Sequence, residues 1–482
     1  MEDSKLPTEE EQLRQRTEAS KRLFSLLEQT AGNKAHVNSV TILGTKATRP
    51  VFLEKATKKV LEATTFADVI NKAQLVAEDL QRLDIFEFPV QVLLDNASEN
   101  DPLAPPDSIN VVYQVKEKSR VFIKTGTEIG NNEGNMNGSL TIRNVFGGAE
   151  FLETVASFGT RNSSAFQFSL GKPVNASPDS RIDINAHRVL CNNTLASSYE
   201  ELARGAGLRY KTSSRFGYHE LGYDVTWRSI DRVSPNASLS IRQEAGESLK
   251  SSIHHVFIRE RRDDMLLPSN GHYLRLTQEL SGLFGLGNAH FFKSDLETQY
   301  CKQFGGGQIW MNNEKGEEDA MLMGVHPGYV LSTTFRAGWL ASLSDHPKAS
   351  TVSDRFILGG PLSVRGFRTA GIGPRDYKDA LGGTMYWAAG VSAIAPLPKY
   401  ESKPLRAHVF LNAGTNIPWK TGTSLQSTTQ ALVQSPSIST GLGLIYRHSI
   451  ARIELNYCIP LTAARGDQIK RGLQLGIGLN FL

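Results

Sequence analysis

A two-residue alternation of apolar and polar side chains recurs from about residue 120 to residue 482 and restricts the folds open to this chain. Between residues 221 and 228, for example, Leu, Tyr, Val and Trp alternate with Gly, Asp, Thr and Arg, and residues 472–481 show the same pattern. Successive side chains of a β-strand point to opposite faces, so the alternation predicts strands with one apolar and one polar face.

Two-faced strands occur in soluble β-sandwiches and in transmembrane barrels, where the polar face lines the lumen. Residues 120–482 contain no linker that would divide them into separate sandwiches. At roughly 20–23 residues per strand and connection, this length suffices for ~16 strands. We therefore predict one transmembrane β-barrel of ~16 antiparallel strands over residues 120–482. A soluble all-β interaction protein is the less favoured alternative.

The first 119 residues follow a different pattern. Residues 1–35 alternate acidic and basic side chains and predict a charged, partly helical segment, to which we assign no chemistry. Residues 36–119 predict a strand, two helices that begin at Pro50 and near Phe66, and then two strands, residues 88–95 and 108–116. This order predicts a small α+β domain, whose edge strand is a candidate docking site for another chain.

Composition and motifs argue against several classes of function. A net charge of +4 over 482 residues is too small to indicate a nucleic-acid partner. The three cysteines lie far apart and form no C-x-x-C pair, which argues against a zinc site or a disulfide framework. The sequence contains no nucleophile elbow, no phosphate-binding loop and no H-E-x-x-H pair, so we expect no enzyme, metal or cofactor. The charged N-terminus lacks the apolar stretch of a secretory signal, so we expect no Sec export.

The sharpest local motif is F-I-L-G-G-P-L-S-V-R-G-F over residues 356–367, which ends in Val364, Arg365, Gly366 and Phe367. Its glycines and proline allow a sharp turn that presents one guanidinium and one ring at a loop tip. Inside a wide barrel such a tip would fold into the lumen, where the arginine would pair with carboxylates on the wall. On composition alone, an external loop with a solvated arginine is the more frequent outcome.

The string L-G-G-x-x-x-V-R-G-F resembles the signature of the β-barrel assembly superfamily, which includes bacterial BamA and the translocators of two-partner secretion. Residues 263–276 and 143–150 are similar to two further motifs of that family. Residues 36–118 are similar in element order to a polypeptide-transport-associated (POTRA) domain. The lack of an export signal and the single POTRA unit favour the mitochondrial branch, the core subunits of the sorting and assembly machinery (SAM).

The resemblance implies an insertase that folds β-barrel precursors into the mitochondrial outer membrane, with its POTRA domain in the intermembrane space. The implied partners are precursor barrels, the lipid bilayer, and peripheral SAM subunits on the cytosolic side, with no cofactor. A polypeptide-conducting or passive outer-membrane pore of the two-partner-secretion type is the alternative. In the bacterial relatives that the sequence resembles, two carboxylates bind the loop arginine, and Ser392 and Asn412 stand at the matching positions here. The partner of Arg365 therefore stays open, and Glu454 or another lumen carboxylate could take this role.

The implied mechanism answers a physical difficulty. Each backbone N–H or C=O group that stays unpaired at a strand edge in lipid costs several kcal/mol. A precursor therefore needs a catalyst whose own strand edge can pair with it. We predict a lateral gate between the first barrel strand, residues 121–128, and the last, residues 473–481, where a precursor strand would add. The candidate gate residues are Val121, Ile123, Thr125, Gly126 and Thr127 in the first strand and Gln474, Gly476, Gly478, Leu479 and Phe481 in the last.

The glycines in these two strands have two interpretations. Glycine weakens strand pairing, which suits a seam that parts, but barrels also use glycine for curvature alone. The last strand also resembles the mitochondrial β-signal, the tag that client barrels display, although any amphipathic final strand matches this loose pattern fairly often.

Overall fold

The structure is a computed structural model, and it describes residues 30–97, 105, 107–130, 133–160, 163–305, 308–310, 322–325, 328–344, 350–398, 404–419, 424–448, 451–479 and 481–482. The segment predicted over residues 1–35 lies outside this description up to residue 29. The chain forms two compact units. The first contains the N-terminal α+β domain with residues 141–152 and 170–182, and the second contains most of the barrel.

The α+β domain has the predicted element order. Its elements are β1 (His36–Leu43), α2 (Pro50–Leu61), α3 (Phe66–Arg82), β2 (Gln91–Asn96) and β3 (Ser108–Gln114). The three strands form a sheet in which β3 lies between β1 and β2, parallel to the first and antiparallel to the second. Strand β2 begins later than the predicted Phe88, since Pro89 has no backbone N–H to donate to a ladder.

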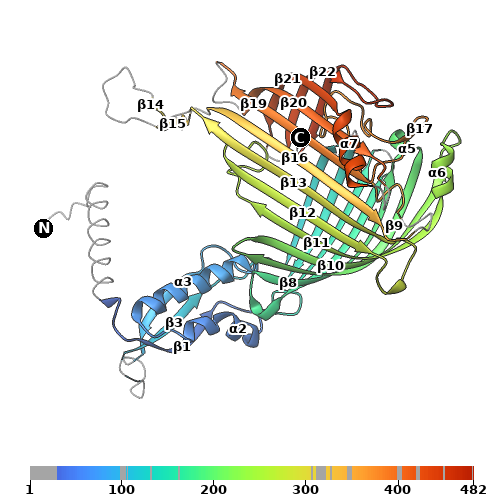
Figure 1. Ribbon diagram of the computed structural model, residues 1–482. Helices are drawn as coiled ribbons and strands as arrows, with labels where there is room; N and C mark the ends of the chain where they lie inside the picture. The colour runs from blue at the N-terminus through green and yellow to red at the C-terminus, as the bar shows by residue number, and fades with distance from the viewer. Residues whose placement is uncertain are drawn as a thin grey trace. The chain divides into compact units, whose positions relative to one another are not determined.

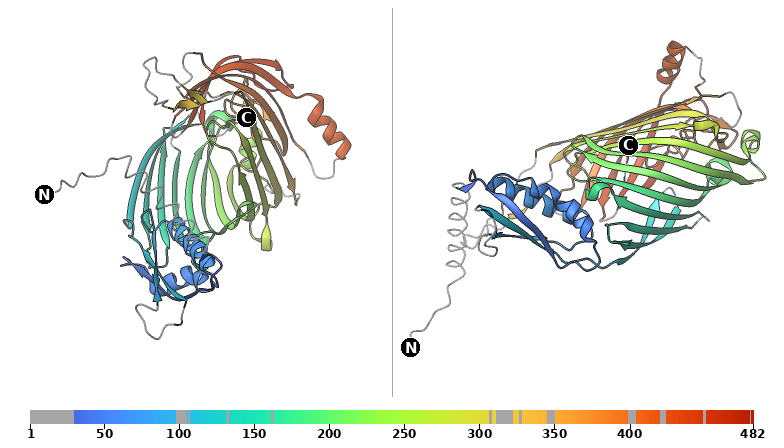
Figure 2. Two further views of the ribbon diagram at one scale, coloured as in Figure 1. Left: turned by 90° about the vertical axis from the view of Figure 1, so that its left-hand side faces the viewer. Right: turned by 90° about the horizontal axis from the view of Figure 1, so that it is seen from below.

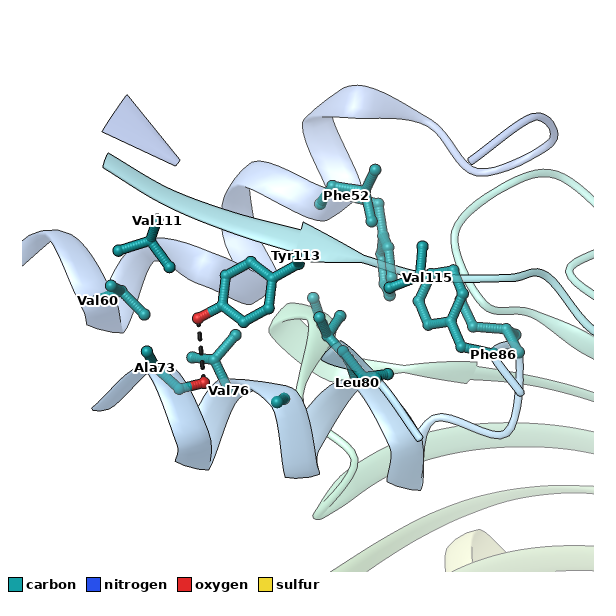
Figure 3. Close-up of a cluster of buried hydrophobic side chains, with 14 of the residues drawn as sticks. Phe52, Val60, Ala73, Val76, Leu80, Phe86, Val111, Tyr113 and Val115 are labelled. Atoms are coloured by element: carbon teal, nitrogen blue, oxygen red, sulfur yellow. Dashed lines mark hydrogen bonds between the residues drawn. The ribbon is translucent and has the colours of Figure 1, made fainter. Parts of the chain in front are cut away.

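One apolar core joins the two helices to this sheet (Figure 3). Helix α3 begins after Thr65, whose hydroxyl accepts a hydrogen bond from the backbone N–H of Asp68 and so caps the helix. Val69, Val76 and Leu80 of α3 are fully buried against the sheet. Tyr113 of β3 is also fully buried, and its hydroxyl donates to the Ala73 carbonyl at 3.1 Å, so its polar atom is satisfied inside the core.

The chain from Val121 to Gly478 forms a sheet of 16 strands (Figure 1), which confirms the predicted strand number. Each strand pairs with its neighbours along the chain, in the order β23-β22-β21-β20-β19-β16-β13-β12-β11-β10-β9-β8-β7-β6-β5-β4. The strands are β4 (Val121–Gly130), β5 (Glu133–Arg143), β6 (Phe151–Gly159), β7 (Ser164–Pro173), β8 (Ser180–Asn192), β9 (Tyr199–Ser214), β10 (Gly217–Val233), β11 (Gly246–Glu260), β12 (Gly271–Ser281), β13 (Phe291–Phe304), β16 (Tyr329–Ser342), β19 (Met385–Pro396), β20 (Leu405–Ile417), β21 (Ser437–Arg447), β22 (Arg452–Thr462) and β23 (Gly472–Gly478).

The alternation seen in the sequence separates the two faces of the barrel wall. In β22, Leu455 and Tyr457 are 44% and 42% exposed, whereas Glu454 and Asn456, which alternate with them, are fully buried. The apolar face therefore points outward, and the polar face points into the lumen, as a barrel in lipid requires. None of the described helices is both long and apolar enough to cross a membrane.

Several connections at one end of the barrel carry additional structure. The long loop, residues 343–384 between β16 and β19, contains the hairpin β17 (Arg375–Asp376) and β18 (Asp379–Ala380). Three short helices lie in neighbouring connections: α5 (Thr194–Ser197), α6 (Leu239–Glu244) and α7 (Leu425–Gln434). Because successive strands alternate in direction, these connections share one end of the barrel, which we call the loop end. The remaining short elements are β14 (Gln308–Trp310), β15 (Leu322–Val325), η1 (Val174–Ala176) and η2 (Leu283–Gly285).

Candidate functional site

The long loop folds into the lumen and buries the motif that the sequence singled out. Val364, Arg365 and Phe367 are all fully buried, so the external loop favoured by composition alone is not what the chain forms. Gly366 makes the turn between the arginine and the ring at a φ of +83°, a conformation that L side chains rarely adopt. Backbone hydrogen bonds fasten the turn to the segment before β23, including one of 2.8 Å from the Lys470 N–H to the Gly366 carbonyl.

Glu454 of β22 is the carboxylate partner of Arg365. The Nε and Nη2 atoms of Arg365 donate to Oε2 of Glu454 at 3.1 and 2.9 Å, and both side chains are fully buried. Asn412 of β20 also lies within reach, with its amide oxygen 3.4 Å from Nη1. Of the two residues that stand where carboxylates were expected, Asn412 is therefore a neutral partner, and Ser392 is buried on the inner face of β19.

A second arginine shares the same carboxylate. Nη2 of Arg452 lies 2.5 Å from Oε1 of Glu454, so one negative charge faces two positive ones in the buried cluster. Aromatic rings flank the guanidinium groups: Phe410 lies 4.8 Å from that of Arg365, and Phe481 lies 5.0 Å from that of Arg452. The negative faces of these rings attract cations and so stabilise the two guanidinium groups.

Gln474 of β23 holds the backbone of the motif. Its amide oxygen accepts from the Gly366 N–H at 2.9 Å, and its amide nitrogen donates to the Phe367 carbonyl at 3.0 Å. Both halves of the amide are thus used, and the side chain is only 3% exposed. The predicted gate residue Gln474 therefore contacts the chain's own loop, a pairing that the strand pattern alone did not indicate.

The last residues of the chain leave the barrel wall. Strand β23 ends at Gly478, so the predicted last strand to Phe481 was too long. Phe481 is 5% exposed and Leu482 is 3% exposed, and the carbonyl oxygen of Leu482 accepts from Nη1 of Arg365 at 2.7 Å. An added Cβ on Gly476 would lie 2.9 Å from the Phe481 ring, so this glycine provides room for the buried ring.

The predicted gate strands stand at the two ends of the strand order. The described residues pair β4 with β5 and β23 with β22, and neither strand has a second neighbour in that order. Val121, Ile123, Thr125, Gly126 and Thr127 of β4 are all exposed. In or just beyond β23, Leu473, Leu475 and Leu479 are more than half exposed, while the inner positions contact the loop.

Three aspartates hold the other part of the long loop, and sequence analysis did not identify them as site residues. Asp354 accepts from Nη1 of Arg228 on β10 at 2.7 Å, and both side chains are buried. Asp379 accepts from the Ser238 N–H at 2.7 Å, and Asp376 accepts from the Ser240 hydroxyl at 2.7 Å. The long loop is therefore fixed both to the wall and to the connection that contains α6. The only signal in the sequence was the position of Asp376 in the glycine-rich run after the motif.

The described residues of this loop take part in no metal-binding cluster. Across the part of the chain that the structure describes, no group of three or more His, Cys, Asp and Glu is placed to hold a metal ion. The cysteines are free thiols, of which Cys191 is exposed and Cys301 and Cys458 are buried. The polar contacts of the loop are hydrogen bonds and ion pairs, which position a loop.

The fold and this site define a class: a transmembrane β-barrel with an N-terminal α+β domain, whose own loop occupies the lumen. Residues 144–481 match the Omp85 superfamily domain. Among solved structures, BamA from Haemophilus ducreyi lacking POTRA domains 1–3 has a similar fold, with a TM-score of 0.70 and 17% identity over 93% of this chain and 85% of that chain.

Curated relatives are similar over nearly the whole chain. A SAM50-like protein of Schizosaccharomyces pombe is 35% identical over 100% of this chain and 96% of its own length. The human sorting and assembly machinery component 50 homolog is 34% identical over 88% of this chain and 85% of its own length. The chain therefore belongs to the Omp85 superfamily and, within it, to the sorting and assembly machinery component 50 homologues.

Proposed function

We propose that this chain folds β-barrel precursors and inserts them into the mitochondrial outer membrane through a seam between β4 and β23. As a member of this family, the chain is a barrel of the mitochondrial outer membrane that acts in barrel assembly, with its α+β domain on the intermembrane-space side. The proposal adds to this the position of the seam and the exchange of strands there.

The main support for the seam is that β4 and β23 stand at the two ends of the strand order. Strand β23 has 7 residues, whereas its neighbour β22 has 11. A strand this short forms only a short ladder, so fewer hydrogen bonds must break when β23 parts from a partner. An incoming strand would satisfy the released backbone groups, which lipid leaves unpaired.

The proposal requires no covalent step and no cofactor. A precursor gains free energy when its apolar outer face enters lipid and when its strands pair. The exposed edge of β4 or β23 supplies the first pairing partner. We also propose that peripheral SAM subunits bind on the cytosolic side at the loop end, where Tyr377 at the tip of the β17–β18 hairpin is 92% exposed.

A polypeptide-conducting pore is the second candidate, and the buried loop disfavours it. The long loop is tied to the wall of the lumen through Glu454, Gln474 and Arg228, so transport along the lumen would have to break these contacts. The two candidates place a translocating chain in different positions. In an insertase the precursor contacts β4 or β23, and in a pore it contacts the inner wall of the barrel.

Site-specific crosslinking to an arrested precursor separates the two. Single cysteines would be introduced at Thr125 of β4, Leu475 of β23 and Thr277 on the inner face of β12, with the exposed Cys191 replaced by serine. Val409, an outward residue of β20 that is 59% exposed, provides a lipid-facing control away from both end strands.

Adducts at Thr125 or Leu475 in one strand register, with none at Val409, would support insertion at the seam. Adducts at Thr277 alone would establish the pore instead. Equal adducts at Leu475 and Val409 would show contact with the outer wall in general and would contradict a seam.

A further inference from the structure

Helix α7 (Leu425–Gln434) occupies an unusual position for a loop element of a barrel. It lies in the connection between β20 and β21 and packs against β20. Figure 2 shows it outside the barrel wall, away from the lumen that the long loop fills. The outer wall of a transmembrane barrel faces lipid, so an element seated on that wall borders the bilayer.

A tryptophan of the outer wall fixes the helix in this position. Ala388 of β19 is fully buried on the inner face, so the preceding Trp387 points outward. The indole Nε1 of Trp387 donates to the carbonyl oxygen of Leu432 at 2.9 Å, which satisfies one of the free carbonyls at the end of α7. Trp387 lies near the loop end of β19, at the level where barrels carry interfacial aromatic rings.

The start of the α7 connection is anchored to β19 as well. The Thr384 hydroxyl donates to the Trp419 carbonyl at 2.8 Å and accepts from the Trp419 N–H at 2.6 Å. The β20–β21 connection is therefore held at Trp419 and at Leu432 by residues at or next to the loop end of β19. Such fixed placement distinguishes α7 from a freely solvated loop.

The chemistry of this connection suits a lipid interface. Residues 421–446 contain no Asp, Glu, Lys, Arg or His, and the polar side chains of α7 are Ser, Thr and Gln. Ala431 and Val433 of α7 are exposed, the latter by 71%, whereas Thr428 is only 6% exposed. In contrast, α6 carries charges, and its Glu244 binds Arg355 of the long loop at 2.8 Å.

We propose that α7 lies in the headgroup region of the bilayer and binds the phospholipid interface through its apolar side chains. An in-plane helix buries its apolar face at the boundary between headgroups and acyl chains. Because α7 has no basic residue, its binding does not depend on anionic lipid. The inference concerns lipid contact alone and holds whether or not precursors enter at the seam.

The test places a nitroxide label at Val433→Cys in the full chain, with Cys191 replaced by serine, in nanodiscs of neutral phosphatidylcholine. Collision with oxygen and with a water-soluble nickel complex reports the depth of the label. Tyr377→Cys on the long loop provides the water-exposed reference, and Val409→Cys on the outer face of β20 provides the lipid reference.

We expect the oxygen-to-nickel collision ratio at Val433 to be several times that at Tyr377 and below that at Val409. Trp387→Phe, which removes the indole N–H and keeps an aromatic ring, should lower the ratio at Val433, whereas the matched change Trp227→Phe in β10 should not. A ratio at Val433 equal to that at Tyr377 would overturn the proposal. Shielding that appears only in intact mitochondria would assign the helix to a protein partner instead.

Discussion

Nη1 of Arg365 in the long loop donates to the backbone carbonyl of Leu482, 2.7 Å away, so the loop arginine holds the residues that follow the last strand. The Leu482 side chain packs in one buried cluster with Leu358 and Val364 of the same loop. The position of the long loop in the lumen and the conformation of the chain beyond Gly478 therefore depend on each other. A change that displaces one of them should displace the other.

Replacing Arg365 by alanine should unseat the loop and leave the barrel in the membrane. Glu454 would keep its ion pair with Arg452, so the buried carboxylate would still have a partner. Losing a hydrogen bond to a charged group typically costs ~1.5–3 kcal/mol, and most of this loss should fall on the loop. We expect faster proteolysis in residues 350–384 and impaired client assembly, measured in isolated mitochondria.

Two further variants control this prediction. Arg365→Lys should rescue little, since an ammonium lacks the planar fork that binds Glu454 and Leu482 together. Arg447→Ala removes an exposed pair with Asp264 and should cost only ~0–1 kcal/mol. Client assembly by Arg365→Ala at the wild-type rate would refute the role of the loop.

Alanine at the two predicted gate glycines Gly476 and Gly126 should have opposite outcomes. A Cβ at Gly476 would lie 2.9 Å from the Phe481 ring, whereas nothing lies within 4 Å of one at Gly126. We expect Gly476→Ala to destabilise the barrel by ~1–3 kcal/mol through overpacking, and Gly126→Ala to be neutral or slightly stabilising. Thermal unfolding in detergent, followed by heat-modifiable electrophoresis, measures both. Equal effects at the two positions would indicate that both glycines act by weakening the strands.

Gln474→Glu should loosen the loop although it changes little in size. The variant keeps an acceptor for the Gly366 N–H but replaces the donor to the Phe367 carbonyl by a carboxylate oxygen. Leaving a buried polar group without its partner costs ~1–3 kcal/mol. We expect increased proteolysis of the long loop in the purified protein, with Leu475→Ala on the outer face as the control. An unchanged cleavage rate would restrict Gln474 to a role in strand pairing.

Acid should loosen the turn at residues 46–48 in the α+β domain. The Glu117 carboxylate accepts from the backbone N–H groups of Ala47 and Thr48 and from the Thr48 hydroxyl at 2.7 Å. Burial alone would raise the pKa of Glu117, but these hydrogen bonds outweigh it and hold that pKa below its ordinary value. The stabilisation is therefore complete above the unfolded-state pKa, near 4.3, and is lost as pH falls through the lower folded-state pKa.

Amide hydrogen exchange measures this loss. Exchange at Ala47 and Thr48, corrected for the intrinsic pH dependence, should rise below about pH 4 in the wild-type chain. In Glu117→Gln, protection should be weaker at pH 7 and should vary little with acid. Protection in the wild type that stays constant down to pH 3 would contradict this role of Glu117.

The local sequence predicted the helices and strands of the α+β domain and the strands of the barrel. A period of two specifies which side chains share a strand face, so residues 120–482 predicted the number of strands and the sides of the barrel wall. Pro50 marked the start of the first helix of the α+β domain, and the apolar period that begins at Phe66 indicated the second. The resemblance carried by residues 356–367 pointed to the family before any fold was known.

Other assignments depended on contacts between residues far apart in the chain. Gln474, Gly476 and Phe481 continue one alternating pattern, yet Gln474 binds the long loop and Phe481 lies in the lumen rather than in β23. Arg365 pairs with Glu454, which lies 89 positions further along the chain, and not with carboxylates at the two positions where they were expected. The sequence alone determined the alternating faces, because adjacent side chains set them. Where the strand ends and what the arginine binds depend on contacts between the long loop, β22 and β23, which lie far apart in the sequence and which no local pattern encodes.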